Sequence, residues 1–193
     1  KPTWRIKFEA LTHPGWLYEY ATGPGLTASN WEKYAAAAGV KDVLAFVSSE
    51  LPSPVTWDDI KHLRKSWAGP LVIKGIMHHD DARQAAALGV DGIIVSNHGG
   101  RQLDRSPAPF EVLPRIADAV GGKATVMMDS GIRRGSDILA ALAAGAKFCF
   151  VGRWTLYGVA AAGEAGANHA VTMIKDEVVK TMTQIGAPDI GAL

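Results

Sequence analysis

Short apolar runs alternate with amphipathic segments through most of the chain, from about residue 55 onward. Each run ends in polar or glycine-rich residues, and a segment follows in which apolar residues recur every three or four positions. A short apolar run bounded by turn residues is typical of a buried strand, and the longer spacing is typical of an amphipathic helix. The pattern predicts four strands, at residues 70–75, 92–96, 124–129 and 147–152.

The segments around these strands carry helix signals. Thr56 precedes a segment with Asp58 and Asp59 in its first turn and Gly69 at its end, an arrangement that caps a helix and complements its dipole. Strands that alternate with helices indicate right-handed βαβ crossovers and a parallel sheet. Helices are expected at residues 57–69, 80–89, 109–120 and 136–145, from near Trp154, and over about 166–185.

Four βα units make half of an eight-stranded (β/α)8 (TIM) barrel, so the expected fold class is α/β with a half-barrel over residues 55–193. A half-barrel alone leaves two sheet edges unpaired and one sheet face uncovered. The other half of the barrel is therefore expected as a partner, supplied by another stretch of the natural protein.

Residues 1–54 differ from the rest, because Trp and Tyr are scattered there among Gly, Pro, Thr and Asn. Residues 28–39 predict one helix capped by Ser29 or Asn30, whereas residues 13–26, HPGWLYEYATGPGL, are expected to be irregular. Two interpretations of this loop and helix segment stay open. It covers the outside of the barrel with its aromatic side chains, or it touches a membrane surface, where Trp and Tyr are enriched.

Composition narrows the class of protein. Lys and Arg number 20 against 19 Asp and Glu, without a long basic run, so no nucleic acid partner is expected. Cys149 is the one cysteine and lies in an apolar run, which suits a small core residue in a reducing compartment. No apolar stretch is long enough to span a bilayer, and the start lacks a signal-peptide layout. A cytoplasmic location is expected, and the alternative is peripheral attachment to the inner face of the membrane.

Polar side chains stand at the carboxyl end of each expected strand. In a parallel barrel these ends meet on one face, where active sites are built. Glycine-rich turns and arginines also precede two helix starts, in DSGIRRGSD and VGR, and such turns bind phosphate in many barrels, although turn chemistry alone is the alternative. The groups at the strand ends are Lys74, Ser96 and His98 with Arg101, Asp129, and Gly152 with Arg153.

The stretch SNHGGRQLD resembles the active-site signature of the FMN-dependent α-hydroxy acid dehydrogenases and oxidases, which include glycolate oxidase, flavocytochrome lactate dehydrogenase and mandelate dehydrogenase. The similarity continues through VIKG, MMDSGIRRGSDILAALAAGA, FVGRWTLYG and TQIGAPDI, and THPGW resembles the family segment after the fourth strand. The resemblance implies that the half-barrel is the C-terminal one, with strands 5–8 and their helices, and that FMN is the cofactor.

The resemblance also implies roles for individual residues. His98 would be the active-site base, Arg101 would clamp the substrate carboxylate, and Asp129 would hydrogen-bond His98. Lys74 would lie beside N1 and the C2 carbonyl of the flavin. These roles suit the side chains, because histidine titrates near neutral pH and a guanidinium matches a carboxylate. The cofactor contacts would be Lys74, Ser96, Asp129, Ser130, Gly131, Ile132, Arg133, Gly152 and Arg153.

The implied reaction is oxidation of a mandelate- or lactate-like L-2-hydroxy acid to the 2-oxo acid, with electrons passed to a membrane quinone or to oxygen, in a homotetramer. Two other functions stay open: a lyase or aldolase in which Lys74 forms a Schiff base, and a non-catalytic half-barrel that binds phosphate ligands. The pair His78 and His79 is not expected to bind metal, because adjacent side chains should diverge and no third ligand stands nearby.

Overall fold

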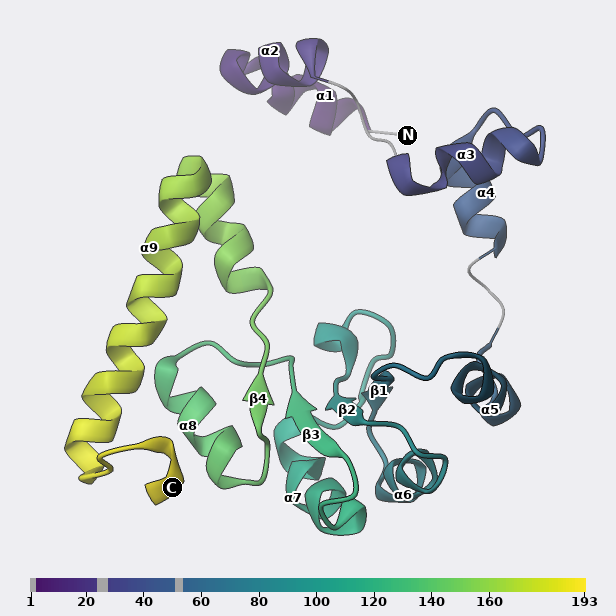
Figure 1. Ribbon diagram of the computed structural model, residues 1–193. Coiled ribbons are helices and arrows are strands. Elements are labelled where there is room, and N and C mark those ends of the chain that lie inside the picture. Colours follow the sequence, from purple (N-terminus) through teal and green to yellow (C-terminus); the bar gives the residue numbers. More distant parts are fainter. Residues whose placement is uncertain (1–2, 24–27, 51–53) are drawn as a thin grey trace. The chain divides into compact units, whose positions relative to one another are not determined.

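The computed structural model describes residues 3–23, 28–50 and 54–193, and the chain divides into two compact units, Lys1–Val55 and Thr56–Leu193. The regular secondary structure in the described residues of the first unit is helical (Figure 1). Its helices are α1 (Trp4–Leu11), α2 (Pro14–Thr22), α3 (Ser29–Ala37) and α4 (Val43–Glu50).

Helix α2 corrects the expectation of an irregular segment at residues 13–26, because residues 14–22 are helical; residues 24–26 of that segment lie outside the described residues. Pro14 stands at the first turn of the helix, where its fixed φ favours helix and its missing N–H costs nothing. Helix α4 was not expected either, and its start is explained by Asp42, whose Oδ1 accepts the N–H of Ala45 at 3.0 Å. Local capping groups therefore outweigh the weak apolar periodicity of this unit.

Most aromatic rings of α1 and α2 are exposed. Trp4 is 84% exposed and Tyr18 71%, and Trp16 stacks on Tyr20 with ring centroids 5.1 Å apart. None of the helices in the described part of the chain is both long and apolar enough to cross a bilayer.

The second unit holds a four-stranded parallel sheet with strand order β1-β2-β3-β4, so each strand pairs with the next one in the sequence. Helices connect consecutive strands, as the alternation of apolar runs and amphipathic segments predicts. The fold is the C-terminal half of a TIM barrel, and strands 5–8 of that barrel are β1 (Val72–Ile76), β2 (Gly92–Val95), β3 (Thr125–Met128) and β4 (Phe148–Cys149). The helices of this unit are α5 (Trp57–Ser66), α6 (His79–Ala87), α7 (Pro109–Val120), α8 (Gly135–Ala143) and α9 (Arg153–Ile185).

Local signals explain where these helices begin. Thr56 and Asp59 form a capping box before α5, in which Asp59 Oδ2 accepts the N–H of Thr56 at 2.8 Å and Thr56 Oγ1 accepts the N–H of Asp59 at 3.3 Å. Helix α7 starts at a proline and ends at Gly121, whose φ of 56° is the left-handed cap conformation. Its bounds match the expected 109–120.

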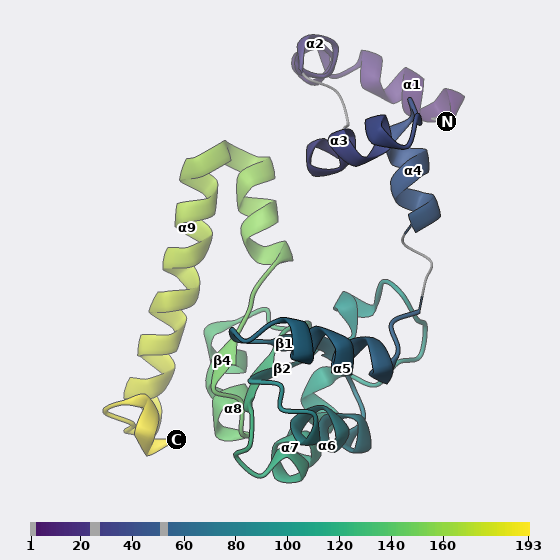
Figure 2. The same cartoon turned by 45° about the vertical axis from the view of Figure 1, so that its right-hand side comes forward.

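Helix α9 contains the two helical stretches expected after Trp154, joined at a sharp break. Ala162 and Gly163 leave the helical conformation, and the two limbs fold back on each other (Figures 1 and 2). Trp154 Nε1 donates to the carbonyl of Ala170 across the limbs at 3.0 Å. A Cβ on Gly166 would lie 1.9 Å from the Gly158 carbonyl oxygen, so the close approach of the limbs requires glycine.

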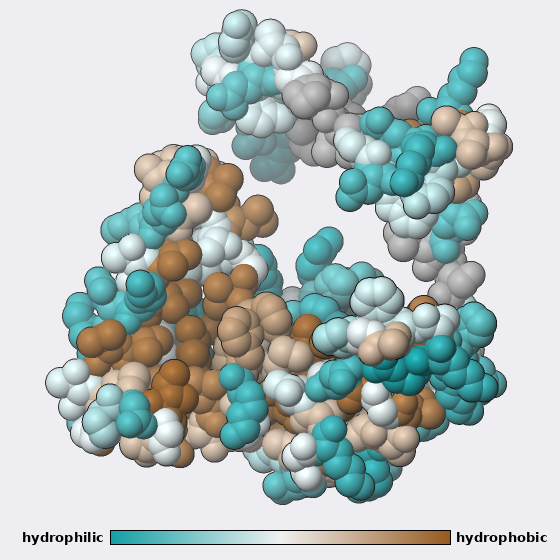
Figure 3. All heavy atoms as spheres, viewed as in Figure 1, coloured by the Kyte–Doolittle hydropathy of each residue, from teal (hydrophilic) through white to brown (hydrophobic). Residues whose placement is uncertain are grey.

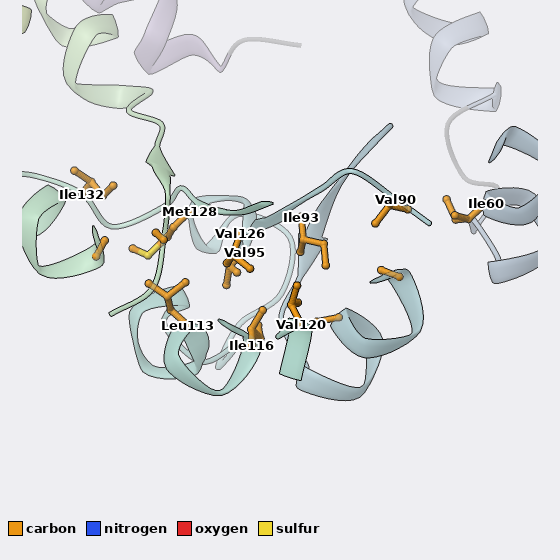
Figure 4. Packing of buried hydrophobic residues seen from close by; sticks show 14 residues of the cluster. Ile60, Val90, Ile93, Val95, Leu113, Ile116, Val120, Val126, Met128 and Ile132 are labelled. Atoms are coloured by element: carbon orange, nitrogen blue, oxygen red, sulfur yellow. The ribbon is translucent and has the colours of Figure 1, made fainter. Parts of the chain in front are cut away.

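The core lies between one face of the sheet and the helices. Ile93 and Val95 of β2 are fully buried against Leu113 and Ile116 of α7 (Figure 4). Full burial of an aliphatic side chain contributes about 1.5–3 kcal/mol, so this face carries much of the stability of the unit.

The other face of the sheet is open. Lys74, Ile94, Met127 and Phe148 pair in register across the four strands and therefore share this face, and Phe148 is 56% exposed. In Figure 3, apolar residues also gather over α9. Strands β1 and β4 are edge strands among the described residues. An open apolar face between two edges is the expected form of a barrel half without its partner.

Candidate active site

The strand ends surround a cavity of about 460 Å³. Lys74 comes from β1, His98 from the turn after β2, Asp129 from the end of β3 and Arg153 from the segment after β4. The topology thus brings together groups that lie far apart in the sequence. Of the residues expected at the site, those lining the cavity are Lys74, His98, Arg101, Asp129, Ser130, Gly131, Ile132, Arg133, Gly152 and Arg153.

Ser96 does not line the cavity but joins two residues that do. Its side chain is buried, and Ser96 Oγ accepts a hydrogen bond from Lys74 Nζ at 2.7 Å and from the backbone N–H of His98 at 3.2 Å. The serine therefore fixes the ammonium of β1 against the start of the turn after β2.

Lys74 and Asp129 form an ion pair in the cavity, with 2.7 Å between Nζ and Oδ2. The other carboxylate oxygen, Oδ1, accepts from Ser130 Oγ at 2.7 Å. Burial raises the pKa of Asp129, but hydrogen bonds from Lys74, Ser96 and Ser130 and the charge of Lys74 together hold that pKa below its ordinary value. The carboxylate is therefore ionised at neutral pH.

His98 sits in an unusual backbone conformation. Its φ is 58°, and Gly99 and Gly100 follow with φ of 70° and 72° in the short 3-10 helix η1 (His98–Gly100). A non-glycine residue in this region costs on the order of 1–3 kcal/mol and is typical of functional sites. Further contacts hold the turn, among them one from the N–H of Gly100 to Asn97 Oδ1 at 3.1 Å and one from Arg153 Nη2 to the Gly99 carbonyl at 3.2 Å. The result is an exposed imidazole at the cavity.

The expected hydrogen bond between Asp129 and His98 is not formed among the described residues. Lys74 and Ser130 occupy the two oxygens of the carboxylate, and Ser130 in turn accepts the N–H of Gly99 at 2.9 Å. The bond between an ammonium and a carboxylate is charge-assisted and therefore among the stronger hydrogen bonds. Asp129 therefore reaches the histidine turn through Ser130 and the backbone, and not through the imidazole.

The cavity is positively charged. Lys74, Arg101, Arg133 and Arg153 line it, and Asp129 is the one carboxylate among its lining residues. Such a surplus of positive charge favours anionic ligands, because guanidinium groups bind carboxylates and phosphates through paired N–H donors.

Three aromatic residues of the cavity were not anticipated from the sequence: Phe150, Trp154 and Tyr157. Phe150 contacts Phe148 with ring centroids 4.9 Å apart and the ring planes tilted by 60°. The alternation of side chains along a strand could have found it, since Cys149 packs toward the core and its neighbours must face the other way. Trp154 and Tyr157 follow the last strand on α9, and no local signal marks them.

Cys149, His78 and His79 lie outside the cavity. Burial raises the pKa of Cys149 to about 11, so its thiol stays neutral and is a poor nucleophile. The expectation that His78 and His79 diverge is wrong, because their ring centroids lie 4.3 Å apart and Asp80 lies beside both. His78 Nδ1 accepts the N–H of Asp80 at 3.3 Å, which makes His78 the cap of α6.

The whole chain, residues 1–193, matches the family described as FMN-dependent dehydrogenase. It is 39% identical over 191 residues to an L-lactate dehydrogenase of Chromohalobacter salexigens and 40% identical over 187 residues to one of Pseudomonas aeruginosa. These alignments cover 98% and 96% of this chain but 49% of each relative. The chain thus spans about half the length of the curated relatives it matches.

A solved mandelate oxidase variant with (S)-mandelic acid has the same fold as the matched part of this chain. Its TM-score is 0.70 and its sequence identity 41%, and the match covers 72% of this chain and 42% of that one. With the match over its full length and the strand-end cavity, this chain belongs to the FMN-dependent dehydrogenase family.

Proposed function

We propose that this chain is the C-terminal half of an enzyme that oxidises an L-2-hydroxy acid, lactate- or mandelate-like, to the 2-oxo acid with FMN as its cofactor. The observation that carries the proposal is the cationic cavity at the strand ends, with His98, Arg101 and the Lys74–Asp129 ion pair around it. The relatives named L-lactate dehydrogenase and the mandelate oxidase structures support the substrate class.

The residues present fit FMN. The cavity volume of about 460 Å³ lies in the range of ordinary ligand sites, and an adjoining hollow of about 440 Å³ shares Gly99, Arg133 and Arg153 with it. Arg133 and Arg153 would hold the phosphate together with the turns at Gly131 and Gly152. Lys74, Ser96, Asp129, Ser130 and Ile132 would complete the cofactor contacts. When bound, FMN supplies the acceptor for the two electrons that leave the substrate.

The chain's own residues have distinct tasks in this proposal. Arg101 binds the substrate carboxylate and orients the hydroxyl-bearing carbon. His98 takes a proton from the 2-hydroxy acid at a ring nitrogen, which leaves an imidazolium in the same cavity as the ionised Asp129, and the second hydrogen leaves the substrate with the two electrons that FMN would accept. Lys74 keeps a positive charge in the cavity, and Asp129 and Ser96 hold its ammonium in place.

The Schiff-base alternative is less well supported. Lys74 donates to both Asp129 and Ser96 as an ammonium, whereas attack on a carbonyl needs the free amine. The non-catalytic alternative does not account for the strained φ of His98, which holds an exposed imidazole at the cavity.

We propose a membrane quinone as the electron acceptor, with oxygen as the alternative. The exposed rings of Trp4, Trp16, Tyr18 and Tyr20 suit the interfacial layer of a bilayer, where Trp and Tyr are enriched. Cosedimentation of the natural protein with anionic vesicles, and turnover that is faster with quinone than with oxygen, are the expected results. Oxygen-dependent turnover without vesicle binding would contradict this acceptor. The proposal also includes the other half of the barrel as a partner of this chain and assembly of the enzyme as a homotetramer.

The central test uses the complete natural reading frame. The purified protein should show a flavin absorbance spectrum. Lactate, mandelate and glycolate are then added anaerobically in turn, and only the acid that is the substrate should bleach the flavin absorbance. A colourless protein would reject the cofactor assignment. A yellow protein that none of the three acids bleaches would reject the substrate class but keep FMN.

A further inference from the structure

Three backbone N–H groups at the start of α8 are bound by two carboxylates. Asp137 Oδ2 accepts the N–H of Arg133 at 2.8 Å and of Arg134 at 3.0 Å. Glu177 Oε2, from the second limb of α9, accepts the N–H of Gly135 at 2.7 Å. Asp137 is local to the turn, whereas Glu177 lies 42 residues beyond Gly135 in the chain.

The contact with Glu177 is built into the packing of the two helices. A Cβ on Gly135 would lie 2.4 Å from the Val178 backbone nitrogen and 2.7 Å from the Glu177 carbonyl carbon. Gly135 is buried and Glu177 is half-buried. Glycine at this position lets the start of α8 approach α9 closely enough for the carboxylate to reach the backbone.

This arrangement changes how the cavity can bind an anion. A free helix N-terminus attracts a phosphate through its unpaired N–H groups and its dipole. Here two carboxylates occupy the N–H groups of Arg133, Arg134 and Gly135, so these three donors are taken, and the group of this turn that reaches the cavity is the guanidinium of Arg133, which lines it together with Arg153. The tasks at the α8 start are therefore divided. Carboxylates fix the turn, and arginines bind the ligand.

We propose that Glu177 is a positioning residue for the phosphate site: by holding Gly135 it fixes the preceding turn, and with it the place of Arg133 in the cavity. This proposal rests on the proposed function, in which the phosphate is that of FMN. Nothing in the contact requires Glu177 to touch the cofactor, so its effect should be confined to recognition of the phosphate.

The test compares FMN with riboflavin, which has the same ring system without the phosphate, in the natural full-length protein stripped of flavin. Glu177→Leu removes the acceptor oxygen, and Glu177→Gln keeps an acceptor without the charge. Glu164→Leu, on an exposed part of the same helix, is the matched control. Affinities are measured by quenching of flavin fluorescence.

We expect Glu177→Leu to lower the ratio of FMN to riboflavin affinity about tenfold, the scale of one lost hydrogen bond to a charged group. Glu177→Gln and Glu164→Leu should keep the parental ratio. Equal losses for both flavins in Glu177→Leu would show a merely structural role and overturn the proposal, as would an unchanged ratio. A parental protein that binds neither flavin would instead reject the proposed function.

A second measurement needs no variant. Amide hydrogen exchange of the parental protein should show the Gly135 N–H protected before FMN is added and equally protected afterwards. Rapid exchange without FMN, or protection that appears only with FMN, would overturn the proposal whether or not Glu177→Leu folds.

Discussion

The two sides of the cavity are held by different means. On the side of β2 and β3, His98 and Ser130 have φ of 58° and 71°, and an ion pair and two serines tie the turns together. On the side of α8, ordinary capping by carboxylates fixes the turn before Arg133. Strained backbone and a dense polar network thus occur on the side where the proposed function moves a proton, and relaxed capping occurs on the side where it binds the phosphate.

This comparison separates the expected effects of substitutions. Changes on the His98 side should lower the rate of substrate-driven flavin reduction while FMN stays bound. Changes on the Arg133 side should lower FMN affinity while the rate at saturating FMN is kept.

The largest effect is expected for His98→Ala. Removal of the base should slow anaerobic flavin reduction by about a thousandfold, within the range for general base catalysis, with FMN still bound. Stopped-flow absorbance measures the rate, and His169→Ala, an exposed histidine on α9, is the control. Reduction at the parental rate would remove His98 from the mechanism.

Arg101→Lys should raise the KM for the hydroxy acid about tenfold or more, because a lysine cannot donate two parallel hydrogen bonds to a carboxylate. FMN content should not change. Steady-state assays over a range of substrate concentration give the comparison, and an unaltered KM would argue that another group binds the substrate carboxylate.

Arg133→Leu tests the phosphate side of the cavity, and the same substitution at the neighbouring Arg134 serves as the comparison. FMN affinity should fall about tenfold, since a charged hydrogen bond to the phosphate is lost, while flavin reduction at saturating FMN keeps its rate. Arg134→Leu is the matched control, because Arg134 does not line the cavity. Equal effects of the two variants would show that general positive charge, and not position, binds the phosphate.

The smallest effect concerns stability and pH. The pKa of Asp129 is lower in the folded state, so the carboxylate stabilises the fold above its unfolded pKa of about 3.9, and this contribution is lost as the pH falls through the folded pKa. Asp129→Asn should therefore lower the free energy of unfolding at pH 7 by on the order of 1 kcal/mol, with a smaller difference near pH 3. Urea unfolding of the parental protein and the variant at pH 7 and near pH 3 measures this loss of stability. An equal loss at the two pH values would contradict the prediction.

The sequence determined the order of strands and helices in the half-barrel and the groups at the strand ends. Helix α7 shows why, since Pro109, Glu111 and Gly121 are local start and stop signals that need no tertiary contact. The family motif then gave the candidate residues of the cavity. The prediction of an irregular segment at α2 was wrong. The aromatic, glycine-containing sequence of this segment has weak apolar periodicity, although Pro14 favours a helix start.

Only the tertiary structure decided which groups touch. Asp129 binds Lys74 and Ser130 in place of His98, because strand register puts the ammonium 2.7 Å from the carboxylate. Glu177 reaches Gly135 because α9 folds back at Gly163 and packs on α8. Hydrogen bonds depend on differences of a few tenths of an ångström between residues far apart in the chain, and the local sequence does not set such distances.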